Sequence, residues 1–518
     1  MEADCGGEEG FLATPEKRWT GDCRLQSAAK RPRIAGSDDH DNEGQGALCD
    51  WWPILAQRMG PGVLTILKEV FSQGFCLSTD YSGFGFFEVA LAKLAESLGA
   101  DTSAVKCYRA SDINVTCRRA LLSREGPSRP EHVFGDILGR YAHQVRRSLT
   151  AVHDYWLQQL EVHVSQDKVP RAQAVKDLGE LFIQQMCIVL DAATPEATLY
   201  CYCCRRQCQL LPSSTDTGSR IRIHAAGSTC VDCSQMGSRN MLMGKSSIPF
   251  VIWAQERKTH QEDIIFHECV PGHTSEDLLQ CFLGTSHHII NTTFCPSDLG
   301  WPMTRKRSYT ICVSKAMVSD FTWMLPPVTL AGYGLGRMLK DNGEHYFCCT
   351  GEILREAFDK EAQKMRSKGE NPFVWRDLLS DGDLRRLEEY EAVIASSGDQ
   401  KGTGDIGHIF DVRQAVTHMG SPRQLLPCLL RRSRMWSHRH QRFLIGQEAM
   451  RAMGWPSDEK SLEMLKGFTD AELMSAASNA MHIPAVTVCL IDLIRVLARE
   501  SRRPAHSAEQ ARPIPTSA

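Results

Sequence analysis

A predicted strand, glycine turn and helix near residue 80 constrain the fold of this chain more than any other feature. Residues 74–79 are mostly apolar, as in a buried strand, and residues 87–94 repeat apolar side chains at helical spacing. Between them, Gly83 and Gly85 allow the backbone to approach a ligand at the partly positive start of the helix. This unit predicts a nucleotide-binding α/β domain whose mainly parallel, doubly wound sheet has helices on both faces.

Acidic residues follow the next two predicted strands. Asp112 ends the strand predicted for residues 105–111, a place where an acid commonly binds ribose hydroxyls. The alternative for Asp112 is a helix cap for residues 115–122. Asp136 follows a short strand predicted for residues 132–134.

Composition excludes several classes of protein. The chain has 518 residues, of which 42% are hydrophobic and 23% charged, as in a soluble globular protein with two or three domains. No run of 18 apolar residues occurs, so we expect no membrane partner. Four acidic residues among the first nine argue against a secretory signal, and we therefore expect the 21 cysteines to be reduced. With a formal net charge of −3, any contact with nucleic acid requires a local basic patch.

Both ends of the chain are predicted to be disordered. Residues 1–48 are rich in Gly, Asp, Glu and Ser without apolar periodicity, and residues 498–518 form a polar tail. The cluster Lys30-Arg31-Pro32-Arg33 is similar to a nuclear import signal, which predicts a nuclear location.

A helical insertion is predicted for residues 138–205, and a cluster of cysteines lies at its end. The cluster comprises Cys201, Cys203, Cys204 and Cys208. This spacing could bind zinc, but no second Cys-x-x-Cys pair follows at the spacing of a zinc finger. We therefore expect free thiols and no metal site.

A cysteine, a glutamate and two arginines lie at the ends of further predicted strands. Cys230 follows a strand at residues 221–226 and precedes a polar loop, although a buried cysteine in a turn would give the same pattern. Glu268 follows a short buried strand predicted for residues 263–266, where an unpaired carboxylate would be costly. Arg305 and Arg307 precede a strand at 308–313, with a solvated edge as the alternative.

In this order the motifs resemble those of the DNA (cytosine-5) methyltransferases. The Phe-x-Gly-x-Gly motif of that family is matched by Tyr81, Gly83 and Gly85, and its Pro-Cys-Gln…Phe-Ser motif by Thr229-Cys230-Val231 with Cys233-Ser234. Its Glu-Asn-Val motif is matched by Glu268-Cys269-Val270, and its Gln-x-Arg-x-Arg motif by residues 303–307. Its Arg-Glu…Gly-Phe-Pro motif is matched by residues 442–456, and its Gly-Asn-Ala motif by Ser478-Asn479-Ala480. The resemblance covers residues 70–495. Val231, Cys269 and Met303 depart from the family pattern.

The resemblance implies a class I S-adenosylmethionine-dependent methyltransferase fold with a smaller inserted target-recognition domain. Residues 49–314 would form the catalytic domain, 315–440 the recognition domain, and 441–497 a segment that completes the catalytic domain. Residues 412–447 contain no Asp or Glu but several arginines, with Trp436 and His438 among them. This composition predicts a phosphate-binding surface, with a solvated face as the alternative. The arginines of this run are Arg413, Arg423, Arg431, Arg432, Arg434, Arg439 and Arg442.

The implied activity is methyl transfer from S-adenosylmethionine to carbon 5 of a flipped cytosine in duplex DNA. Cys230 would be the nucleophile, Glu268 would bind the ring nitrogen and amino group, and Arg305 or Arg307 the ring carbonyl. The resemblance also assigns a cofactor site to Tyr81, Gly83, Gly85, Asp112, Ile113, Asp136 and Asn479. Cys233 takes the place of the family's phenylalanine and is expected to pack beneath the loop.

Two other functions fit the same pattern. One is an RNA, particularly tRNA, cytosine-5 methyltransferase, although the Cys-Phe-Thr triplet usual in that branch is absent here. The other is a non-catalytic nucleic-acid-binding relative, which the three departures permit and the presence of Cys230 and Glu268 disfavours.

Overall fold

The computed structural model describes residues 51–166, 168–212, 217–229, 231–233, 240–272, 275–318, 342–396, 407–419 and 424–501. The two predicted disordered ends, including the basic cluster Lys30–Arg33, lie outside these ranges except for residues 498–501. The candidate nucleophile Cys230 also lies outside the described residues.

Seven strands form the central sheet, and their order identifies the fold. The order is β3 (His132–Phe134), β2 (Val105–Ser111), β1 (Phe75–Asp80), β6 (Ile221–Gly227), β7 (Ile264–Cys269), β9 (Arg307–Ser314) and β8 (His287–Phe294). β9 pairs antiparallel with both β7 and β8, whereas the remaining neighbours pair in parallel. This order, with one reversed strand inserted next to the edge, is that of the class I methyltransferase fold, which confirms the predicted doubly wound sheet.

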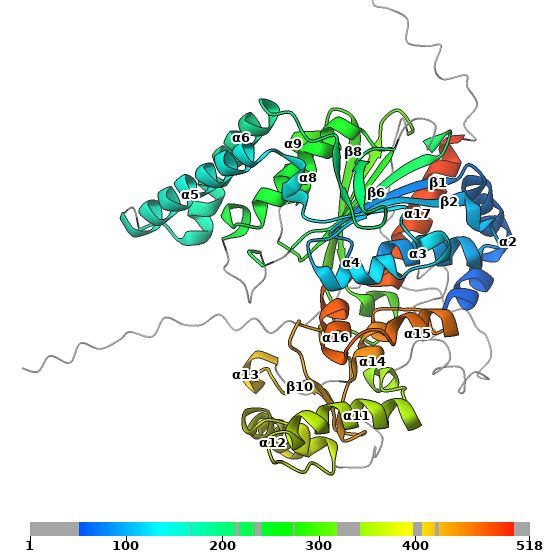
Figure 1. Ribbon diagram of the computed structural model, residues 1–518, viewed down its shortest axis with the longest axis vertical. Coiled ribbons are helices and arrows are strands. Elements are labelled where there is room, and N and C mark those ends of the chain that lie inside the picture. Colours follow the sequence, from blue (N-terminus) through cyan, green and yellow to red (C-terminus); the bar gives the residue numbers. More distant parts are fainter. Residues whose placement is uncertain are drawn as a thin grey trace, which may run out of the picture. The chain divides into compact units, whose positions relative to one another are not determined.

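Helices cover both faces of the sheet (Figure 1). One layer comprises α2 (Trp51–Ser72), α3 (Phe86–Ser97) and α17 (Ile483–Ser501), and the other comprises α5 (His143–Gln166), α6 (Arg171–Asp191), α8 (Ser247–His260) and α9 (Ser275–Leu283). Side chains alternate between the two layers along β7, because Ile264 and Phe266 join the first hydrophobic core and Ile265 joins the second.

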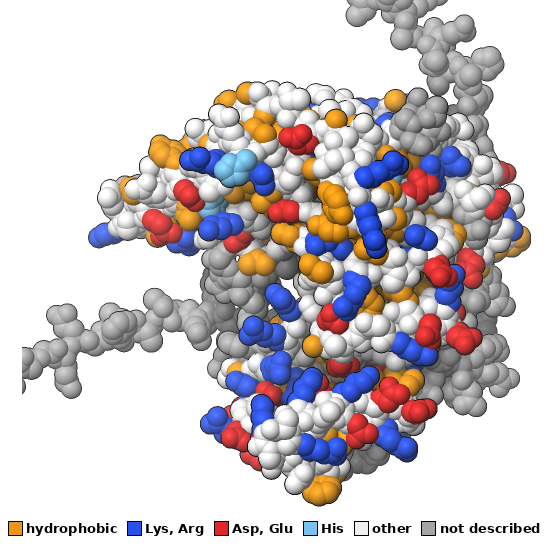
Figure 2. Space-filling model, viewed as in Figure 1, with side chains coloured by type: hydrophobic (Ala, Val, Ile, Leu, Met, Phe, Trp, Pro, Cys, Tyr) orange, Lys and Arg blue, Asp and Glu red, His pale blue; other side chains and the backbone are white. Residues whose placement is uncertain are grey.

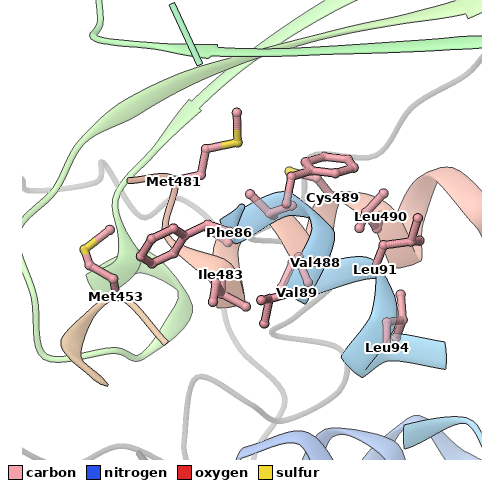
Figure 3. Packing of buried hydrophobic residues seen from close by; sticks show 14 of the residues in the cluster. Phe86, Val89, Leu91, Leu94, Met453, Met481, Ile483, Val488, Cys489 and Leu490 are labelled. Carbon is pink, nitrogen blue, oxygen red and sulfur yellow. The ribbon is translucent and has the colours of Figure 1, made fainter. Parts of the chain in front are cut away.

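The packing of α3 against α17 holds the C-terminal segment to the domain that begins the chain. Leu91 and Leu94 of α3 are buried in the same core as Val488 and Leu490 of α17 (Figure 3). Burial of a leucine side chain contributes roughly 1.5–3 kcal/mol. Residues Asp470–Arg499 contain a helix long and apolar enough to cross a membrane, but 94% of its apolar window is buried inside the fold, as in a core helix.

The insertion after β3 contains two helices and then a hairpin. α5 and α6 pack together through Leu149, Leu160 and Phe182. The predicted helix does not extend to residue 205, because β4 (Thr198–Cys201) and β5 (Arg206–Gln209) pair antiparallel there.

The region predicted for target recognition has a small core of its own. It contains α11 (Gly351–Arg366), α12 (Asp381–Ser396), α13 (Val416–Met419) and a sheet of β10 (Ile409–Asp411), β11 (Met435–Ser437) and β12 (Arg442–Phe443). Leu387, Tyr390 and Trp436 are fully buried in this core. Between α11 and α12, residues Trp375–Leu378 form a 3-10 turn, η8, and the Asp377 carboxylate accepts the N–H groups of residues 373 and 374.

Shorter elements complete the chain. After β12, α14 (Gly446–Ala452), α15 (Glu459–Leu465) and α16 (Asp470–Asn479) lead into α17, and α4 (Val115–Leu122) links β2 to β3. The other 3-10 turns among the described residues are η1 (Thr102–Ala104), η2 (Gly126–Ser128), η3 (Ile137–Arg140), η4 (Met241–Met243), η5 (Pro296–Leu299) and η7 (Gly343–Tyr346).

Candidate active site

The turn between β1 and α3 has the backbone conformation that its glycines predict. Tyr81, Gly83 and Gly85 all have positive φ angles, of 52°, 57° and 76°. A Cβ atom at Gly85 would lie 2.9 Å from the buried guanidinium of Arg124, whereas one at Gly83 would meet open space. Gly85 is therefore required both by its conformation and by close packing, and Gly83 leaves room for a ligand.

Asp112 is bound to this turn. One carboxylate oxygen accepts the Gly83 N–H group at 2.8 Å, and the other accepts the Asn114 N–H group at 2.7 Å. Burial raises the pKa of Asp112, and these two hydrogen bonds oppose the rise. Asn114, and not Asp112, caps α4 by accepting the Thr116 N–H group, so the helix-cap interpretation of Asp112 is wrong.

A small pocket lies beside the glycine turn. Its lining includes Tyr81, Gly83, Gly227, Asn479 and Met481. Residues nearly 400 positions apart in the sequence therefore meet here, as expected if α16 packs back against a cofactor site. The Asn479 side chain donates to the Ser475 carbonyl at 2.8 Å.

Three other predicted cofactor residues lie at neighbouring strand ends, outside the lining of this pocket among the described residues. Asp112 and the 68% exposed side chain of Ile113 follow β2. Asp136 follows β3 and accepts the Leu138 N–H group at 2.9 Å. The charge of Asp136 contributes to raising the pKa of the Tyr81 hydroxyl, although burial of the ring contributes most.

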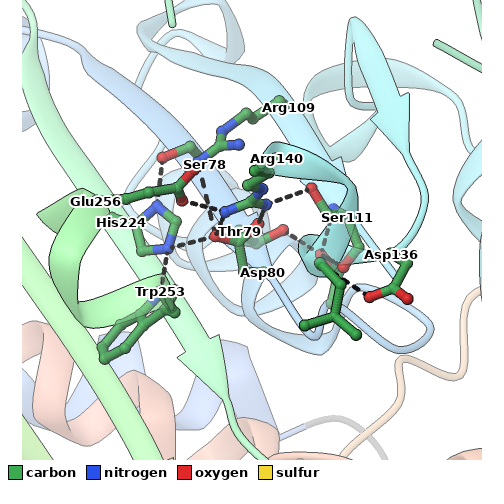
Figure 4. A network of polar contacts seen from close by, with 12 residues as sticks. Ser78, Thr79, Asp80, Arg109, Ser111, Asp136, Arg140, His224, Trp253 and Glu256 are labelled. Atoms are coloured by element: carbon green, nitrogen blue, oxygen red, sulfur yellow. Dashed lines mark hydrogen bonds and ion pairs between the residues drawn. The ribbon is translucent and has the colours of Figure 1, made fainter. Parts of the chain in front are cut away.

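A buried ionic network, which the sequence did not suggest, lies at the end of β1 (Figure 4). Arg140 donates to the Asp80 carboxylate at 3.0 Å and also binds Glu256. Burial raises the pKa of Asp80, but the nearby cations, Arg140 foremost, outweigh it and hold the pKa well below its usual value. Trp253 donates to His224 at 2.8 Å, and burial lowers the pKa of His224 to about 4. Asp80 also lines the pocket, so this network fixes a charged side chain in the pocket wall.

Glu268 and Arg307 form an ion pair at the ends of β7 and β9. The Arg307 Nε atom lies 3.2 Å from Glu268 Oε1. Burial raises the pKa of Glu268, and the charges of Arg307 and Arg305 oppose the rise. Gly227 is the register partner of Glu268, and its Cβ position lies 3.7 Å from Glu268 Oε2. The carboxylate therefore lies between Arg307 and the end of β6, next to the pocket that Gly227 also lines.

Arg305 has a different set of partners. Its guanidinium is 98% buried and donates to the Ser478 carbonyl at 3.0 Å and to the Ala480 carbonyl at 2.5 Å. Arg305 thus holds the segment around Asn479 in place. Of the two arginines predicted to bind the ring carbonyl, Arg307 is the one that pairs with Glu268.

The loop that carries Cys230 is anchored on both sides of that residue. Ser228 is buried, with its hydroxyl 2.8 Å from the His267 ring. Asp232 accepts the backbone and hydroxyl groups of Ser246 at 2.9 and 2.6 Å. Cys233 is half-buried.

The predicted phosphate-binding surface is smaller than the sequence indicated. Trp436 is fully buried, and Arg442 is buried in a bidentate pair with Glu448 at 2.8 and 2.7 Å, so assigning these two residues to the surface is wrong. Arg431, Arg432 and Arg439 are exposed, and Arg423 lies outside the described residues. Figure 2 shows that Lys and Arg side chains on the face in view are interspersed with Asp and Glu.

No protein-family model and no curated protein matches the sequence. Among solved structures, the chain is similar to the S. pombe Dnmt2 methyltransferase, with 16% identity, a TM-score of 0.37 and coverage of 82% of this chain and 99% of that one. It is also similar to the Entamoeba histolytica methyltransferase EhMeth, with 11% identity, a TM-score of 0.39 and coverage of 83% and 99%. A Spodoptera frugiperda DNMT2 mutant is similar at 12% identity, with a TM-score of 0.35 and coverage of 82% and 99%. The fold assignment depends on the strand order described above.

Proposed function

We propose that this chain transfers a methyl group from S-adenosylmethionine to carbon 5 of cytosine in duplex DNA, with the base flipped out of the helix. One observation carries the proposal: the Glu268–Arg307 pair lies beside Gly227, which also lines the glycine-turn pocket. A base recognised by the pair would therefore be next to a methyl donor bound in the pocket. Cys230, three residues after Gly227, would be the nucleophile.

The residues around the pocket suit the methyl donor. Gly83 leaves open space beside the backbone, Asp112 places a carboxylate at the end of β2, and Ile113 offers an exposed apolar side chain. A carboxylate at the second strand of such a fold suits ribose hydroxyls, and the apolar side chain suits the face of an adenine ring. S-adenosylmethionine, when bound, supplies an electrophilic methyl group.

Each polar residue of the base site has a separate task in this proposal. The Cys230 thiolate forms a bond to carbon 6 of the ring, which moves electron density to carbon 5 and makes it nucleophilic. Arg307 stabilises the negative charge that builds on the ring carbonyl. After methylation, loss of the proton from carbon 5 and expulsion of the thiolate restore the aromatic ring.

Glu268 supports the addition step from the ring nitrogen. Because burial raises its pKa, its protonated form is more populated than in water, and that form can donate to the ring nitrogen as the thiolate adds. The other oxygen of Glu268 can accept a hydrogen bond from the exocyclic amino group of the base. Arg305 takes no part in base binding, since two backbone carbonyls occupy its guanidinium.

We assign contact with the phosphate backbone of DNA to three exposed arginines, Arg431, Arg432 and Arg439. They lie close together in the sequence, on either side of the buried strand β11. Contacts of this kind give affinity that depends on salt and not on base sequence.

Tritiated methyl transfer from S-adenosylmethionine to duplex DNA and to tRNA tests the proposal. We expect transfer to DNA, a loss of about 100-fold or more in Glu268→Gln, and no loss in Glu276→Gln, whose side chain is exposed on α9. Transfer to tRNA alone would assign the RNA substrate instead. Binding of S-adenosylmethionine without transfer to either nucleic acid would contradict catalysis.

A further inference from the structure

We propose that His132, Cys201, Cys204 and Cys208 bind a structural zinc ion. The ligand atoms of these four residues all lie within 4.8 Å of one another. His132 Nδ1 is 3.6 Å from Cys201 Sγ and 3.5 Å from Cys204 Sγ. A tetrahedral ion with bonds of about 2.3 Å to sulfur and about 2.0 Å to nitrogen requires S–N separations of about 3.5 Å. The two separations from His132 therefore match a tetrahedral zinc site, and the remaining donor atoms lie within 4.8 Å of one another.

The turn between β4 and β5 has the geometry of a metal-binding knuckle. The Cys204 N–H group donates to Cys201 Sγ at 3.4 Å, which orients that sulfur. Arg205, the next residue, has a positive φ of 55°, a conformation that non-glycine side chains disfavour. Its N–H group donates to the Cys201 carbonyl at 2.7 Å. The turn thus keeps a costly conformation that brings Cys201 and Cys204 together.

The hairpin has a small hydrophobic core. Its strands have four residues each, and two-stranded hairpins of this size are at best marginally stable on their own. The hydrophobic cluster that includes Cys201 and Cys208 adds only Phe134 and Leu210 as further buried residues. An ion bound to all four ligands would cross-link β4, β5 and the main-sheet strand β3, which carries His132.

Four protein ligands leave no open coordination position, so the ion would be structural and not catalytic. No second Cys-x-x-Cys pair follows these cysteines at the spacing of a zinc finger, which is why the sequence favoured free thiols. His132, which lies 69 residues before Cys201, joins Cys201, Cys204 and Cys208 in the ligand set, and no motif is visible over that distance.

The hairpin also supports two of the loops assigned to the methyl donor. The Tyr202 N–H group donates to the Val133 carbonyl at 2.8 Å, and a Cβ at Gly135 would lie 3.4 Å from the Tyr202 ring. Arg118 lies 4.4 Å above that ring and donates to the Asp112 carbonyl at 2.9 Å. Loss of the ion should therefore weaken binding of S-adenosylmethionine, a consequence that depends on the proposed function. The metal content itself does not depend on it.

Elemental analysis of the full-length protein, purified without added metal, tests the site. We expect one zinc ion per chain in the wild type and in Cys203→Ser, which alters a cysteine of the same turn outside the ligand set. Cys204→Ser and His132→Gln should lose most of the zinc. Cys204 is exposed, so its substitution need not disturb packing.

Replacement by cobalt(II) provides the second readout. A cobalt protein with three thiolate ligands should show intense sulfur-to-metal charge-transfer absorption, reduced in Cys204→Ser and unchanged in Cys203→Ser. A wild-type protein that neither contains zinc nor takes up cobalt would overturn the proposal. Full zinc content in Cys204→Ser, or its loss in Cys203→Ser, would overturn the ligand set. None of these results depends on methyltransferase activity.

Discussion

At the scale of single residues, Arg305 and Arg307 show how neighbours in sequence take different tasks. Arg305 binds the carbonyls of Ser478 and Ala480, whereas Arg307 pairs with Glu268. The sequence predicted that one of them binds the ring carbonyl but did not distinguish them, because the distinction depends on a segment more than 170 residues away. The sequence also did not predict that the side chains of Trp436 and Arg442 are buried, because the basic composition around them indicated a surface.

Substituting the two arginines should separate stability from activity. Arg305→Ala leaves two buried carbonyls unsatisfied and should lower the free energy of unfolding by roughly 2–4 kcal/mol. Arg307→Ala should cost less stability than Arg305→Ala, because the Arg307 side chain is 13% exposed and water can replace part of its pairing with Glu268, and it should abolish most methyl transfer. Urea unfolding and the tritium assay measure the two effects. Equal losses of stability in both variants would contradict the division of roles.

At the scale of elements, the strands and the glycine turn were predictable because their patterns are local. Apolar runs that end in glycine or an acid placed β1, β2, β3 and β7 close to their observed bounds. The β4–β5 hairpin was not predictable, since its short strands expose half of their side chains and its partner His132 lies on another strand. The ionic network of Asp80, Arg140 and Glu256 likewise joins three distant segments with no shared spacing.

The two glycines of the turn should respond differently to alanine. Gly85→Ala places a Cβ 2.9 Å from the Arg124 guanidinium and should lower the free energy of unfolding by roughly 1–3 kcal/mol. Gly83→Ala enters open space, so only the positive φ should cost stability, about 1 kcal/mol, but the added methyl group should weaken S-adenosylmethionine binding. Denaturation and calorimetry distinguish these effects. Wild-type affinity in Gly83→Ala would remove that position from the cofactor site.

At the scale of the whole molecule, the domain buries ionisable groups on both sides of its sheet. Burial lowers the pKa of His224 to about 4 and that of His482 to about 3. Unfolding would expose both rings to water, where a histidine titrates near pH 6.5. Between about pH 6.5 and 4, the unfolded chain therefore binds protons that the folded chain does not.

The free energy of unfolding should consequently fall as the pH drops through this window. Each such histidine contributes a slope of at most about 1.4 kcal/mol per pH unit, and its contribution is complete above the unfolded pKa. His224→Gln should reduce the slope, whereas His143→Gln, at an exposed position on α5, should not. Denaturant titrations at several pH values measure the slope of the free energy of unfolding against pH. An unchanged slope in His224→Gln would mean that His224 is charged in the folded state.

Attack of the proposed nucleophile Cys230 on cytosine can be tested with a covalent trap. Duplex DNA containing 5-fluorocytosine cannot release the enzyme after methylation, because no proton can leave carbon 5. With S-adenosylmethionine present, we predict a denaturation-resistant adduct for the wild type and for Cys233→Ala, and none for Cys230→Ala. An adduct that survives Cys230→Ala but is lost in Cys233→Ala, or the absence of an adduct in the wild type, would contradict the account.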